Sequence, residues 1–176
     1  IDDKVIPDLT RLESARAASQ KFIRDNYKKA RIGLFSLDSE MDRACAKTAN
    51  PEVEKEVLLG LVDTLRATEQ VSPLARTQTT INNYFKGPTS PIQYRCQKNY
   101  SVVLTDGEPD NDTGSLDAAA QLSYDTDAKT TGNDMAGKSY QTTDLGEIWL
   151  KQNVIPYIVG LGLENDILKR TPLTNT

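Results

Sequence analysis

The residues best placed for chemistry in this sequence lie where a short apolar segment ends. Residues 101–104 read Ser-Val-Val-Leu, a composition that predicts a buried strand. Thr105 and Asp106 follow directly, and Gly107 then turns the chain. Ligands of open α/β sheets bind outside the carboxyl ends of the strands. The Asp106 carboxylate is therefore predicted to lie at a ligand site, and carboxylate oxygens are groups that hard divalent cations bind.

The sequence on both sides of Asp106 resembles a known family. Cys-Gln-Lys-Asn-Tyr occupies residues 96–100, before the predicted strand, and Thr-Asp-Gly-Glu-Pro occupies residues 105–109, after it. Together they resemble the von Willebrand factor A (VWA) domain of the PilC/PilY family, whose members sit at the tip of bacterial type IV pili. The whole run is specific, whereas Thr-Asp-Gly alone is a weak signal.

That resemblance implies a metal-ion-dependent adhesion site. The A-domain site holds its cation with an Asp-x-Ser-x-Ser loop, a threonine hydroxyl and the aspartate of Thr-Asp-Gly. Asp106 matches the last of these, and Ser72 lies before Pro73-Leu74, where the family usually has Thr-Pro-Leu. The resemblance thus implies that Asp106 and Ser72 bind Mg²⁺, or Mn²⁺ or Ca²⁺ in its place. From its position alone, Ser72 is explained at least as well as the N-cap of a helix, and it could do both.

The remaining loop of such a site has no counterpart in the chain. No aspartate here has serine at both required positions. In the family, the strand that carries this loop would precede Ile1. Residues 1–176 are therefore expected to form one partial A-like domain, in which the first strand and the last helix are incomplete. We expect that strand to lie upstream or to come from another polypeptide, and the cation site to be completed by residues upstream of Ile1.

Hydrophobic spacing and helix caps predict the elements that must position these residues. Thr-Arg-Leu-Glu at residues 10–13 forms a capping box at the start of the first helix. Helices are predicted at about 11–27, 51–65, 73–86, 115–122 and 145–149, with a last one from about 165, and strands at 31–37, 101–104 and 154–162. This alternation predicts an α/β fold with a mainly parallel sheet. The resemblance narrows it to a Rossmann-like open sheet with helices on both faces.

Composition narrows the classes of function. The net charge of −4 argues against a nucleic-acid partner, which requires a basic face. No apolar run approaches the ~20 residues of a membrane-spanning helix. Histidine is absent, which excludes serine–histidine and cysteine–histidine catalysis within this chain.

The resemblance implies a binding module and not an enzyme. It implies export to the cell surface, at the pilus tip and associated with the outer membrane, with roles in pilus assembly, twitching motility and attachment. Its implied partners are minor pilins of the pilus tip and a ligand on host cells or solid surfaces. A structural A domain without metal is one alternative. A phosphotransfer enzyme of haloacid-dehalogenase type, with Asp106 as nucleophile, is a weaker one, because Glu108 stands where that site has a second aspartate.

Export also bears on the two cysteines, Cys45 and Cys96. Their number alone does not distinguish paired from free thiols. For the exported protein that the resemblance implies, we predict a Cys45–Cys96 disulfide. It would close a loop of about fifty residues and stabilise the fold by ~4 kcal/mol in the chain-entropy model. Mass spectrometry of non-reduced peptides tests this pairing, and two alkylatable thiols in freshly purified exported protein would exclude it.

Overall fold

The computed structural model describes residues 10–37, 51–66, 73–105, 114–141 and 151–160. Within them the chain forms a mixed α/β structure, which confirms the predicted class. The elements, in chain order, are α1 (Arg11–Asn26), α2 (Pro51–Thr64), α3 (Leu74–Lys86), β1 (Asn99–Thr105), α4 (Leu116–Asp125) and β2 (Val154–Gly160). The predicted helices at 145–149 and from 165 lie outside the described residues.

Two parallel strands form the sheet of the described part. β1 and β2 pair along their whole length, from Asn99 opposite Val154 to Thr105 opposite Gly160. The predicted parallel pairing is therefore confirmed for these two strands. Pro156 lies inside β2, opposite Ser101. A proline is tolerated in a strand whose outer edge is unpaired, and among the described residues no third strand borders β2.

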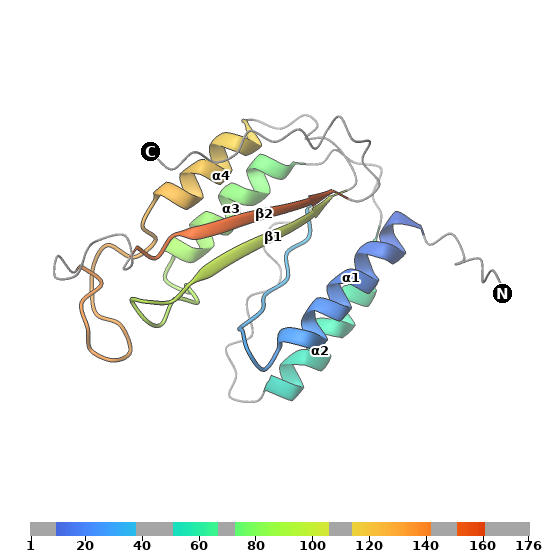
Figure 1. The fold of residues 1–176 in the computed structure, drawn as a ribbon, viewed down its shortest axis with the longest axis horizontal. Coiled ribbons are helices and arrows are strands. Elements are labelled where there is room, and N and C mark those ends of the chain that lie inside the picture. The colour runs from blue at the N-terminus through green and yellow to red at the C-terminus, as the bar shows by residue number, and fades with distance from the viewer. Residues whose placement is uncertain (1–9, 38–50, 67–72, 106–113, 142–150, 161–176) are drawn as a thin grey trace, which may run out of the picture.

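Helices α3 and α4 pack together on one face of this sheet (Figure 1). The alternation of buried and exposed residues along β1 follows from that cover, since Ser101, Val103 and Thr105 face the helices and are buried. The other face carries apolar side chains that are about half exposed: Tyr100 at 51%, Val102 at 47%, Tyr157 at 51% and Val159 at 42%. No described helix covers this second face, so the expected helices on both faces are seen on one face only.

Helices α1 and α2 form a second packing unit beside the sheet (Figure 1). The predicted capping box is confirmed, because the Thr10 hydroxyl accepts from the Glu13 backbone N–H and the Glu13 carboxylate accepts from that of Thr10. The apolar stripes of the two helices meet in a small core: Ile23, Leu58, Leu59 and Val62. Other members of the same predicted stripes remain about half exposed: Phe22, Val53 and Val57.

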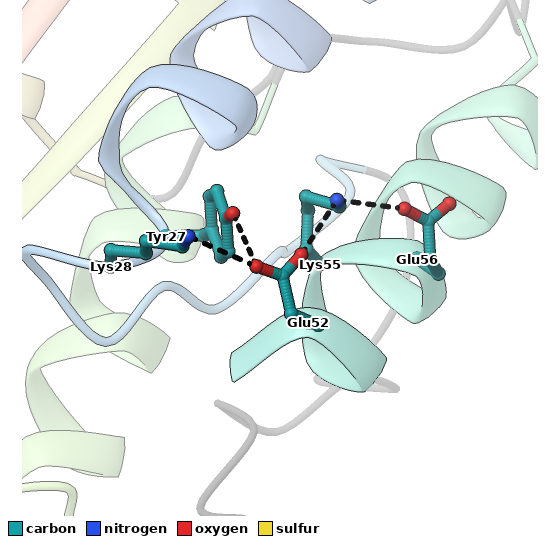
Figure 2. A network of polar contacts seen from close by, with 5 residues as sticks. All are labelled: Tyr27, Lys28, Glu52, Lys55 and Glu56. Carbon is teal, nitrogen blue, oxygen red and sulfur yellow. Dashed lines mark hydrogen bonds and ion pairs between the residues drawn. The ribbon is translucent and has the colours of Figure 1, made fainter. Parts of the chain in front are cut away.

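A polar network joins the end of α1 to the start of α2 (Figure 2). The Tyr27 hydroxyl donates to the Glu52 carboxylate at 2.6 Å, and the Lys55 and Lys28 ammonium groups pair with the same carboxylate at 2.9 and 3.2 Å. The Tyr27 bond, followed by those of Lys55 and Lys28, lowers the pKa of Glu52 to about 2. Lys55 also pairs with Glu56 and lies over the Tyr27 ring, 4.9 Å from its centroid. Because the network is exposed, solvent and salt screen it strongly.

The segment 31–37 corrects one prediction from the sequence. Its composition predicts a strand, but the described residues give it no ladder hydrogen bonds, and it is not a strand. Ile32 and Leu34 pack against the core of α1 and α2, and the Phe35 ring meets the Tyr84 ring of α3 edge to face at 5.8 Å. The segment therefore has the apolar contacts of a strand, and the described part of the chain offers it no strand to pair with, which its composition alone does not reveal.

Loops gather at the amino ends of the two strands (Figure 1). We call residues 91–98, 127–141 and 151–153 the amino-end cap. The Asp134 side chain organises it, since its carboxylate accepts from the backbone N–H groups of Ala136, Lys138 and Arg95 at 2.9, 2.8 and 3.2 Å. Residues 127–141 thus form a packed structure, with Asn133 and Ser139 forming a bridge across it. Cys96, in the cap, carries an exposed free thiol, and its predicted partner Cys45 lies outside the described residues.

We predict that the stability of the amino-end cap depends on pH in the acid range. Burial opposes ionisation of Asp134, but its three backbone donors outweigh it and lower the pKa of the carboxyl group. A lowered pKa stabilises the native state above the ordinary aspartate pKa of about 3.9, and this contribution is lost as the pH falls through the native value. We predict that Asp134→Asn lowers the melting temperature at pH 7 and flattens its decline below about pH 4.

Thermal unfolding followed by circular dichroism between pH 7 and pH 2 measures this effect. Asp117→Asn is the matched control, because Asp117 is exposed in the first turn of α4. Equal acid profiles for Asp134→Asn and Asp117→Asn would contradict the role given to Asp134.

Candidate metal site at the carboxyl end of the sheet

The residues that flank the predicted ligands gather at one end of the fold. β1 ends at Thr105, directly before Asp106, and α3 begins at Leu74, two residues after Ser72. α3 runs back along β1, and the Ser101 hydroxyl donates to the Gln78 side-chain oxygen at 3.1 Å. Thr105, the last residue of β1, and Leu74, the first residue of α3, therefore lie toward the carboxyl end of the sheet, where ligands of α/β proteins bind.

Two further contacts bring other segments to the same end. Gly114, before α4, passes the first turn of α3, where a Cβ on Gly114 would lie 3.9 Å from that of Ala75. Its φ of 143° lies in a region that favours glycine. The Thr77 hydroxyl, also in the first turns of α3, donates to the Leu37 carbonyl at 3.5 Å. Leu37 and Gly114, which each lie at one end of a described segment, are thus both close to the start of α3.

Neither predicted metal ligand belongs to the described part of the chain. Asp106 and Ser72 both lie outside the described residues, so their binding of a cation stays a prediction. One alternative for Ser72 is corrected, however. The N-cap of α3 is Pro73, with φ of −79° and ψ of 61°, and the Pro73 side chain makes no capping hydrogen bond. Helical dihedrals begin only at Leu74, one residue later than a Ser72 cap requires.

The described residues provide no alternative metal site. Across residues 10–37, 51–66, 73–105, 114–141 and 151–160, no three His, Cys, Asp or Glu side chains come close enough together to hold an ion. The carboxylates of Asp127 and Asp134 already accept from backbone N–H groups.

A buried polar network fixes the geometry behind this end of the sheet. Gln78 is 0% exposed, and its amide donates to the Ser123 hydroxyl at 3.0 Å while its oxygen accepts from Ser101. Ser123 in turn donates to the Ala119 carbonyl of α4 at 2.9 Å. A buried amide needs such partners, because leaving it unpaired costs about 1–3 kcal/mol. One side chain of α3 therefore ties that helix to both β1 and α4.

Sequence reasoning did not predict this network, although a signal for it is present. Leu74, Gln78 and Ile81 follow helical spacing, which puts Gln78 on the buried face of α3 between two apolar residues. A polar residue inside an apolar stripe requires a buried partner. The spacing does not identify that partner, because Ser101 and Ser123 are brought to Gln78 only by the packing of three elements.

Comparisons of the chain with protein-family models, with curated proteins and with solved structures find no match. Among the described residues, no helix is both long and apolar enough to cross a membrane.

We predict that the hydrogen bonds of Gln78 contribute to the free energy of unfolding. Gln78→Ala removes a fully buried side chain and leaves the Ser101 and Ser123 hydroxyls with one partner fewer, so we expect a loss of about 2–4 kcal/mol in the free energy of unfolding. Ser123→Ala should cost about 1 kcal/mol, since only one hydrogen bond of the amide is lost.

Urea unfolding followed by circular dichroism measures both values. Gln121→Ala is the control, because Gln121 bonds Asp125 within α4 at the surface and its loss should cost below about 0.5 kcal/mol. If Gln78→Ala were no more destabilising than Gln121→Ala, the network would not hold the three elements together.

Proposed function

We propose that this chain is an adhesion module of VWA type from a protein of the type IV pilus tip, and that it binds its ligand through a divalent cation. The observation that carries the proposal is the run from Cys96 to Asp110, which resembles the A domain of the PilC/PilY family. Attachment to host cells or solid surfaces, pilus assembly and twitching motility are the roles proposed with it. The partners proposed are minor pilins of the tip and a surface ligand.

The described structure supports the proposal in two ways. First, the run contains a strand, β1, that pairs in parallel with β2 and ends at Thr105, so the chain enters Asp106 from the carboxyl end of a parallel sheet. Second, α3 begins at this same end, and the positive end of a helix dipole favours acidic groups close to it. An acidic group on a partner would meet both conditions there.

The proposed roles of the ligands follow from their chemistry. Asp106 would supply the carboxylate and Ser72 a neutral hydroxyl, which suits a hard cation that binds one or two carboxylates and keeps several waters. The cation would give the site the positive charge that captures an acidic group of the ligand. The Gln78 network would hold β1 and α3 in register behind these two residues.

An additional strand is part of the proposal. β1 pairs with β2 on one edge, and among the described residues no strand borders its other edge. The segment 31–37 has apolar contacts on two sides, as a strand would, since Ile32 and Leu34 pack against the core of α1 and α2 and Phe35 meets Tyr84. A strand carrying the Asp-x-Ser-x-Ser loop, placed between them, would pair with both and bring the missing ligands to the carboxyl end.

Loss of Asp106 should abolish cation binding. In a chain that carries the proposed additional strand, we expect Asp106→Ala to weaken Mg²⁺ or Mn²⁺ binding by more than about 100-fold, beyond the roughly 10–100-fold cost of losing a side chain that only supports a metal ligand. Ser72→Ala should weaken it less, because a water molecule replaces a neutral hydroxyl. Titration calorimetry measures both affinities.

Glu108→Gln is the matched control, since it removes a neighbouring carboxylate that the family pattern does not use as a ligand. Circular dichroism spectra should coincide for all variants. Equal cation affinity in the unchanged protein and in Asp106→Ala would refute the site, as would tight binding by residues 1–176 alone.

A further inference from the structure

The amino-end cap, at the opposite end of the sheet from the proposed metal site, concentrates positive charge. It contains five basic residues and two acidic ones, a net charge of +3 in a chain whose net charge is −4. The basic residues are Arg95, Lys98, Lys129, Lys138 and Lys151. Arg31 adds a further charge, because its guanidinium donates to the Pro91 carbonyl and to the Gln97 side chain.

The two acidic residues of the cap do not neutralise this charge by pairing. Asp134 accepts from three backbone N–H groups and is 8% exposed, and Asp127 accepts from the backbone N–H groups of Lys129 and Gln152 at 3.0 and 3.3 Å. Within the described part of the chain, neither aspartate forms an ion pair with Arg95 or Lys138. The carboxylates hold the loops together, and the Lys129 ammonium donates to the Gly87 carbonyl at 3.3 Å. The side chains of Arg95 and Lys138 are the charges that a partner can meet.

Two exposed apolar side chains belong to the same loops. Tyr94 is 45% exposed and Met135 is 68% exposed. Their positions are linked, because the Met135 N–H donates to the Gln93 carbonyl at 2.9 Å and the Arg95 N–H donates to Asp134 at 3.2 Å. Tyrosine, methionine and arginine are the residue types enriched in protein–protein interfaces. Methionine in particular adapts its shape to a partner surface.

The cap is a fixed surface and does not need to order itself on binding. The Gln152 side chain is 0% exposed and donates to the Arg95 carbonyl, while the Ala128 N–H donates to the Gln152 carbonyl at 3.2 Å. The Tyr140 hydroxyl reaches the Ile92 carbonyl at 3.4 Å. These bonds join all three loops of the cap, and a preorganised surface loses little entropy when a partner docks.

We propose that the amino-end cap docks an acidic protein segment, one rich in Asp and Glu with an apolar residue that packs on Tyr94 and Met135. Charge complementarity selects such a partner, since acidic side chains meet Arg95 and Lys138 there. The exposed tyrosine and methionine favour a protein over a polyanion such as heparin, because heparin has no apolar group to fill that contact. This surface does not involve the cation, so it stands or falls separately from the proposed metal site.

Binding to a defined probe tests the proposal. The probe is a short Asp/Glu-rich peptide with one central Phe, titrated by fluorescence anisotropy against residues 1–176. We expect Arg95→Gln with Lys138→Gln to weaken binding roughly 10-fold and to reduce its salt dependence. Met135→Ser should weaken it roughly 3-fold without changing the salt dependence, since it removes an apolar contact only.

The control is Lys21→Gln with Arg24→Gln, which makes the same change in net charge on exposed positions of α1. It should leave the affinity unchanged. Heparin and vesicles of phosphatidylcholine and phosphatidylserine are tested in parallel. The proposal is overturned if the peptide does not bind, if the α1 control weakens binding as much as the cap variants, or if heparin or vesicles bind more tightly than the peptide and lose affinity with the same variants.

Discussion

A single buried amide determines how the described sheet and its helices fit together. Gln78 has no exposed surface, and its two polar atoms can be satisfied only when a hydroxyl of β1 and a hydroxyl of α4 stand on either side of it. Apolar contacts between helices and sheets tolerate small slips, because they are not directional. A buried amide does not, since a slip of one residue would leave it unpaired in a region without water. The register of three elements is therefore set by hydrogen bonds and not by shape alone.

Because Gln78 fixes the register of β1, α3 and α4, the residues and contacts at the two ends of the sheet can differ. At the carboxyl end, α3 begins and β1 ends close to a common point, and the described residues there include the apolar or small Leu74, Ala75 and Gly114. At the amino end, loops from three stretches are fastened by carboxylates and amides to their own backbone. The loops at each end of the sheet are held by their own hydrogen bonds. A change in the loops at one end therefore need not disturb the loops at the other end while α3 stays in register.

The sequence was most informative where the structure depends on local chemistry. The capping box at Thr10 and the serine cap at Ser115 are short-range features, and both helices begin where these residues predict. β1 and β2 are apolar runs ended by turn residues, and they too were predictable. The candidate ligands were found through a resemblance and not through any pattern of charge. Asp106 and Ser72 are separated by more than thirty residues, and nothing local in the sequence joins them.

The sequence is least informative about strand pairing and burial, because both depend on which distant residues pack against a given residue. The segment 31–37 has the composition of a strand, yet a strand exists only with a partner that supplies its hydrogen bonds. Phe22 and Val53 follow helical apolar spacing and are still about half exposed, because spacing identifies a face without showing what packs on it. Gln78 shows the reverse, since this polar residue is the most buried member of its helix face, at 0% exposed against 1% for Leu74. Each of these outcomes is decided by distant parts of the chain.

Pro156 makes one edge of the sheet unfavourable for the addition of another strand. Because proline has no N–H, any chain that approached the outer edge of β2 would find a missing donor in the middle of the strand, whereas β1 is seven residues long and contains no proline. Unintended pairing between copies, which begins at unprotected strand edges, is thereby discouraged on one side of the molecule. Among the described residues, the edge of β1 that faces away from β2 carries no such block to pairing. A strand that filled that edge would act both as a structural element and as protection against self-association.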